Sequence, residues 1–131
     1  MKPTNLVICT LFSLSFNVYS QVKSNAEKIE EVFPVEFVAH AHSENSFYHK
    51  LLKERIQIEY SPVQSSEKYK LLSSVPLNTK YNSTLKSILE SAYDPETFNP
   101  LAYQLPFFEP GNYTPTYRID RTDYLIKILP Q

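Results

Sequence analysis

The sequence predicts a small single α+β domain, in which two or three short helices pack on a mainly antiparallel sheet with a C-terminal β-hairpin at its heart. Segments with apolar residues at every second position alternate with segments of helical spacing. Ten prolines divide the chain into short elements, and no internal repeat or long linker is present. A content of 42% hydrophobic and 21% charged residues is that of a globular protein.

Residues 1–20 are expected to be a signal peptide. The segment begins with a positive charge, continues with an apolar run over 6–16 that is too short to span a bilayer, and ends at a cleavage site before Gln21. The folded domain is therefore 21–131. Cys9, the single cysteine, leaves with the leader, and no second apolar run follows. We expect an exported protein without stable membrane insertion after signal removal, most simply periplasmic, with the cell surface or the exterior as alternatives.

The N-terminal part of the domain should begin with a helix. Ser24 and Glu27 form a capping box, which predicts a helix over 25–33 that Pro34 ends. Apolar and polar residues then alternate over 35–42, which predicts a half-buried strand.

The next segment fits two interpretations. Apolar residues at helical spacing favour a helix over 46–54 followed by a strand over 55–60, whereas the same residues also fit one long strand. A loop over 61–66 and a strand over 68–75, ended by Pro76, should follow.

The clearest helical pattern comes next. A cap at Asn82 or Ser83 precedes apolar residues at i, i+3, i+4 and i+7, and Asp94-Pro95 ends the segment. The four apolar positions are Leu85, Ile88, Leu89 and Ala92.

The last third is rich in aromatic residues and proline. Prolines make 101–108 an irregular or edge strand, and 109–112 fits a type II turn with Gly111 at the position of positive φ. The segments 116–119 and 122–129 predict a hairpin that turns at Asp120-Arg121.

Three segments resemble small exported proteins of Bacteroidota that have no assigned activity. They are a leader that ends in Ser before Gln, the segment 98–103, and the C-terminal segment 117–131. The resemblance covers about a third of the chain. It implies export and transfers no functional residue.

Composition excludes several classes of site. The single glycine rules out Gly-rich phosphate loops, and the absence of a thiol from the mature chain rules out cysteine-based catalysis and cysteine-rich metal sites. A net charge of −1 gives no basic field for nucleic acid. No serine-nucleophile motif is present, and Asp120 and Asp123 fit a hairpin turn better than a catalytic carboxylate pair.

A histidine group is the candidate metal site. His40 and His42 lie two positions apart on the predicted strand 35–42, and His49 or Glu44 could complete a zinc or copper shell. The spacing alone does not identify a third ligand, so the competing interpretation is that these histidines lie on a solvent-exposed strand face. We therefore expect no cofactor, with zinc or copper as the alternative.

Aromatic residues give the second candidate site. Most Tyr and Phe side chains should fill the core, because the domain lacks Trp. Tyr113 and Tyr117, among Thr and Pro residues near a turn, are the two expected to be exposed and to contact a ligand or partner.

The function expected from these observations is non-catalytic binding of an envelope protein or peptide, in the periplasm or at the cell surface. Two observations support this binding function: no recognisable set of catalytic residues is present, and the aromatic half of the domain has the character of an edge strand. One alternative is a metal-binding protein, possibly a hydrolase, that uses His40, His42 and His49. A further alternative is a sugar-binding module that uses exposed tyrosines.

Overall fold

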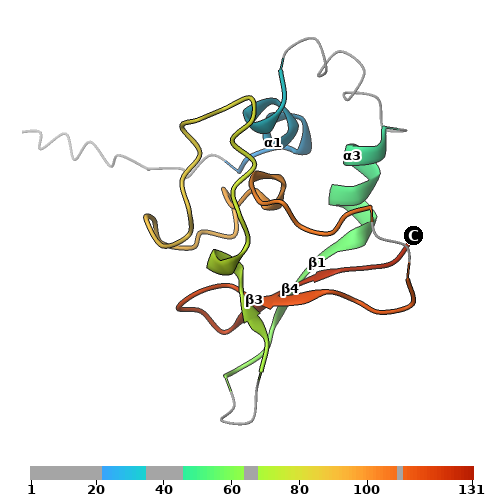
Figure 1. Ribbon diagram of the computed structural model, residues 1–131, viewed down its shortest axis with the longest axis vertical. Helices are drawn as coiled ribbons and strands as arrows, with labels where there is room; N and C mark the ends of the chain where they lie inside the picture. Colours follow the sequence, from blue (N-terminus) through green and yellow to red (C-terminus); the bar gives the residue numbers. More distant parts are fainter. Residues whose placement is uncertain (1–21, 35–45, 64–67, 109–110) are drawn as a thin grey trace, which may run out of the picture.

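The computed structural model describes residues 22–34, 46–63, 68–108 and 111–131. A sheet forms the lower half of the molecule and two short helices lie above it, with the irregular segment 75–99 beside them (Figure 1). This is the small α+β domain that the sequence predicts. The predicted leader 1–20 and the predicted strand 35–42 lie outside the described residues.

The sheet has four strands in the order β1-β4-β3-β2. β4 runs antiparallel to β1 and β3, and β2 runs parallel to β3. The strands are β1 (Ile56–Tyr60), β2 (Lys70–Leu71), β3 (Thr116–Arg118) and β4 (Tyr124–Ile128). The hairpin β3–β4 is therefore at the centre of the sheet, as predicted.

Helix α1 (Asn25–Val32) forms where the capping box indicates. The Ser24 hydroxyl accepts a hydrogen bond from the backbone N–H of Glu27 at 3.2 Å, which satisfies one of the free donors of the first turn. Ile29 and Val32 of this helix are fully buried. The helix ends at Phe33, directly before Pro34.

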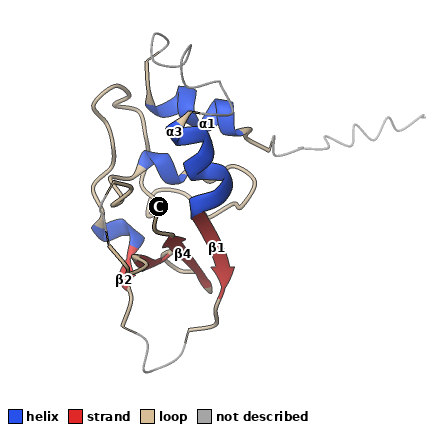
Figure 2. Ribbon diagram, turned by 90° about the vertical axis from the view of Figure 1, so that its right-hand side faces the viewer, coloured by secondary structure: helices blue, strands red, loops and turns tan. Residues whose placement is uncertain are grey.

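A helix that continues into a strand occupies 47–60, so the alternative of one long strand is wrong. Helix α3 (Phe47–Lys50) is followed by a π-helical turn, η1 (Leu51–Arg55), and then by β1. The N–H of Ile56 donates to the carbonyl of Leu51, which closes the π turn. Figure 2 shows that this helix and β1 form one continuous column from the top of the molecule to the sheet.

The helix predicted from Asn82 onward is not formed, and 82–99 contains only turns and irregular backbone. The Asn82 side chain accepts from the N–H of Thr84, a local bond that competes with helix formation. The N–H of Ile88 donates to the Tyr103 hydroxyl at 2.7 Å instead of to a carbonyl one helical turn earlier. Leu89 remains exposed, so the apolar spacing does not describe a buried helix face.

Asn82 does cap a helix, but that helix is α1. Its side-chain amide donates to the carbonyl of Glu31 at 2.7 Å, and the amide of Asn99 donates to the carbonyl of Lys28 at 2.8 Å. The carbonyl of Glu31 lies in the last turn of α1 and has no intrahelical donor, so the Asn82 amide satisfies it. Together the two asparagines, which are far from α1 in sequence, attach the irregular segment to this helix.

Two further predictions differ from the structure. The strand predicted over 68–75 is limited to β2, because 72–74 form a 3₁₀ turn, η2 (Leu72–Ser74), that buries Leu72 in the core. Among the described residues no glycine has a positive φ, so the positive φ predicted for Gly111 is wrong. The irregular course expected over 101–108 is observed: it begins with the 3₁₀ turn η3 (Pro100–Ala102) and makes one isolated bridge, Leu77 to Tyr103.

The core lies between the sheet, the helices and the irregular segment. Its members come from every part of the described chain: Ile29, Val32, Leu51, Leu72, Ile88, Phe98, Leu101, Ala102, Tyr103, Leu105, Phe107, Ile119, Ile126 and Ile128. Only three of these core residues, Phe98, Tyr103 and Phe107, are aromatic, so aliphatic side chains fill most of the core and the other described Tyr and Phe residues are half-buried or exposed, contrary to the expectation from composition. No helix of the described residues has the length and apolar character needed to cross a membrane.

The turn of the central hairpin has an unusual backbone. Arg121 has a φ of 62° and is the only non-glycine residue with positive φ among those described. The N–H of Thr122 donates to the carbonyl of Ile119, so Arg121 is the third residue of a four-residue turn. This position favours Gly or Asn, because a Cβ is strained there.

We expect Arg121→Gly to raise the free energy of unfolding by about 0.5–1 kcal/mol, the difference between the strain of a left-handed residue with a Cβ and the greater unfolded-state entropy of Gly. Urea denaturation followed by circular dichroism measures the change. Arg121→Ala keeps the Cβ and serves as the control, and equal stability of the two variants would contradict the strain.

Candidate functional site

The structure describes one of the three candidate metal ligands. His40 and His42 lie outside the described residues, whereas His49 lies on α3, where its N–H donates to the Ser46 hydroxyl at 3.1 Å. The Nδ1 atom of His49 is buried and has no hydrogen-bond partner. No group of three His, Cys, Asp or Glu residues that could hold a metal ion occurs in the described part of the chain.

Tyr113 and Tyr117, the two candidate ligand-contact residues, line the same cavity of about 340 Å³ beside β2 and β3. Tyr113 is 60% exposed, whereas Tyr117 is half-buried against the core. Tyr69 lines the same cavity, with Lys68 and Lys70. Sequence reasoning missed Tyr69, because the parallel pairing of β2 with β3 that places it there joins segments far apart in the chain.

A second cavity, of about 390 Å³, shares Tyr69 with the first and lies at the turn of the hairpin. Its walls carry two exposed aliphatic residues, Val63 and Leu71, and two arginines, Arg118 and Arg121. The two cavities together have four cationic side chains and one carboxylate, in a chain whose net charge is −1. Positive charge is therefore concentrated around β2.

Asp120 and Asp123 have structural partners, which supports their assignment to the turn. The buried Asp120 carboxylate accepts from the N–H of Ser73 at 2.9 Å and from its hydroxyl at 2.6 Å, so it connects the hairpin to η2. The Asp123 carboxylate accepts from the N–H of Val63 at 3.4 Å. The partner of Asp120 is distant in sequence, whereas the sequence favoured local bonding.

The edge of β1 that no described strand pairs with is a third candidate site. The N–H of Leu129 donates to the carbonyl of Arg55, and the N–H of Ser61 donates to the carbonyl of Asp123. In an antiparallel ladder, backbone N–H and C=O groups of alternate residues point to opposite edges of the strand. Gln57 and Glu59 have the same parity as Arg55 and Ser61, so their backbone groups face β4. The backbone groups of Ile56, Ile58 and Tyr60 therefore point away from β4. The Ile56 N–H is used by the π turn.

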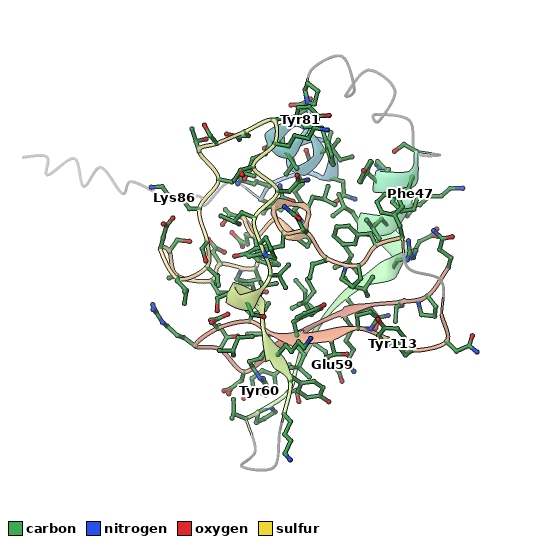
Figure 3. All side chains as sticks on the ribbon, viewed as in Figure 1. Phe47, Glu59, Tyr60, Tyr81, Lys86 and Tyr113 are labelled. Carbon is green, nitrogen blue, oxygen red and sulfur yellow. The ribbon has the colours of Figure 1, made fainter. Side chains whose placement is uncertain are left out.

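Ile58 and Tyr60 therefore have backbone groups on the open side of the sheet. No hydrogen bond of the described residues uses the N–H or carbonyl of Ile58, or the N–H of Tyr60. Their side chains are 38% and 61% exposed. Figure 3 shows Glu59 and Tyr60 in the sheet half of the molecule, far from Tyr81 and Lys86 on the helical half.

Burial perturbs the pKa of three tyrosines, of which Tyr103 is buried and Tyr48 and Tyr93 are half-buried. Burial raises the pKa of Tyr103, although hydrogen bonds from the Ile88 N–H and the Ser87 side chain act in the opposite direction. Burial likewise raises the pKa of Tyr48 and Tyr93. A hydroxyl with a raised pKa stays protonated, so the Tyr103 side chain serves as a hydrogen-bonding group of the core rather than as a base.

No protein-family model, curated protein sequence or solved structure matches this chain. Its function is therefore inferred from its own residues.

We expect the protein to lose stability in alkali because of these tyrosines. The folded state retains phenolic protons that the unfolded chain releases above about pH 10, so the free energy of unfolding falls as the pH rises through that value. Urea denaturation at a series of pH values measures the slope. Tyr103→Phe should reduce the slope, with Tyr69→Phe as an exposed control. A slope that Tyr103→Phe leaves unchanged would contradict the assignment.

Proposed function

We propose that this protein is a non-catalytic binding protein of the periplasm or cell surface, and that an extended segment of an envelope polypeptide adds to its sheet beside β1. The observation that carries the proposal is the set of unpaired backbone groups at Ile58 and Tyr60. An added strand would satisfy these groups, and backbone hydrogen bonds would provide affinity.

The two edges of the sheet differ in how they are protected. β2 has only two residues, one of them Lys70, and a short strand with lysine discourages further pairing. β1 has five residues, Ile-Gln-Ile-Glu-Tyr, with neither Lys nor Pro. A long open edge without these features is suited to pairing, so β1 is the edge that accepts a partner.

The side chains of β1 define the chemistry of the partner. Ile58 and Tyr60 project to one face, and Gln57 and Glu59 to the other. A partner with β-branched residues at every second position would extend the apolar face, and Lys or Arg at the intervening positions would lie near the Glu59 carboxylate. Glu59 already forms an ion pair with Lys127 and keeps an exposed fraction of 54%, which leaves it accessible to a second cation.

A labelled peptide, acetyl-Val-Lys-Val-Lys-Val-amide, tests this proposal. We expect binding by fluorescence anisotropy, with the largest backbone amide NMR shifts at Ile58 and Tyr60. The same peptide N-methylated at all of its residue amides should not bind, because neither of its edges can then donate to the ladder. Glu59→Lys should weaken binding by roughly threefold to tenfold, and Glu54→Lys on η1 is the matched charge control.

Two results would overturn the proposal. One is equal binding of the N-methylated peptide, which would show that the backbone groups of β1 are not used. The other is a concentration-dependent dimer in analytical ultracentrifugation that buries β1 and that the peptide does not dissociate, which would make a second copy of the chain the partner.

The unpartnered Nδ1 of His49 supports a second candidate function, binding of zinc or copper. A neutral imidazole nitrogen without a hydrogen bond is the kind of donor that these ions take. Titration calorimetry of the chelator-treated protein with zinc chloride, and separately with copper(II) chloride, should then show a saturable site. The double variant His40→Ala, His42→Ala should lose it, and unchanged metal binding by that variant would exclude the histidine group.

A further inference from the structure

We infer that the cavity at the hairpin turn is a binding site for a small amphipathic carboxylate, a molecule with one apolar body and one carboxylate group. This site is distinct from the peptide edge, because its lining comes from β2, the end of β3, the β3–β4 turn and Val63, and includes no residue of β1. Its volume of about 390 Å³ is within the range of about 300–1,000 Å³ that small-molecule sites occupy.

The walls provide the apolar half of the recognition. Val63, Tyr69 and Leu71 line the cavity and are 64%, 46% and 49% exposed. These three side chains are among the most exposed apolar groups of the described residues, and here they converge on one hollow. An apolar ligand body would remove their surface from water.

The arginines provide the charged half. Arg118 is buried, with its Nη1 atom donating to the carbonyl of Ser61 at 2.6 Å, so its positive charge lies in the wall where solvent screens it weakly. Arg121 is exposed at the rim, where its guanidinium can turn toward a bound carboxylate. The single carboxylate of the lining, Asp123, already accepts from the N–H of Val63. The lining therefore favours an anion.

The backbone at Arg121 is a separate observation that points to a ligand. A residue with φ of 62° is strained unless it is Gly, yet the chain has Arg at this turn and its side chain lines the cavity. If the guanidinium binds a ligand at the rim of the cavity, that role explains why an arginine occupies this position although it destabilises the turn.

The probe for this site is 4-phenylbutyrate, and its neutral amide, 4-phenylbutanamide, is the control ligand. We expect 4-phenylbutyrate to shift the methyl NMR signals of Val63 and Leu71 in a saturable manner, and the amide to bind at least tenfold more weakly. Arg121→Gln should weaken 4-phenylbutyrate binding by about tenfold. Lys53→Gln removes one positive charge from the exposed surface of η1 and should have no effect.

Arg121→Gly separates a ligand role from a structural one. The variant is expected to be more stable than the wild type and yet to bind 4-phenylbutyrate as weakly as Arg121→Gln. The inference fails if the amide binds as tightly as the acid, if Arg121→Gly retains wild-type affinity, or if neither compound shifts the two methyl signals. None of these results depends on peptide binding at β1, so the two proposals fail separately.

Discussion

The pairing of β4 with both β1 and β3 is the interaction on which the rest of the structure depends. β4 is close to the C-terminus, and its ladders join it to a strand about seventy residues earlier and to its hairpin partner. Ile126 and Ile128 of β4 are fully buried on the core face, against residues from α1, η1 and η2. Because loop-closure entropy opposes such distant pairing, burial of this strand must provide much of the free energy that orders the earlier segments.

Side-chain hydrogen bonds replace regular secondary structure over much of the chain. Asn82 and Asn99 bond to carbonyls of α1, the Tyr103 hydroxyl accepts from the Ile88 N–H, and Asp120 accepts twice from Ser73. Each of these contacts joins segments that a helix or a ladder does not connect. Buried backbone groups must find partners, so a chain whose segment 75–99 forms neither helices nor strands needs polar side chains in its interior.

The two proposed sites follow from the asymmetry of the sheet. β1 has five residues and an outer edge that no described strand pairs with, whereas β2 is short and lies between two cavities lined by cations and exposed apolar groups. The aromatic composition of the last third predicted Tyr113 and Tyr117 as ligand-contact residues, and both line one cavity. Tyr69, Arg121 and the open edge of β1 did not emerge from the sequence as site residues, because strand order and the conformation of one turn decide where they lie.

The sequence by itself determined the elements with a local physical cause: α1 through its capping box and proline stop, the helix and strand of 46–60, and the C-terminal hairpin through alternation around a turn. The prediction of a helix over 82–93 was wrong, because the N–H of Ile88 donates to the Tyr103 hydroxyl although the apolar spacing is helical. The strand prediction was also wrong at Leu72, which enters the core through a 3₁₀ turn instead of extending β2. Only tertiary structure decided these segments, because a weak local preference yields to burial and to hydrogen bonds from distant residues.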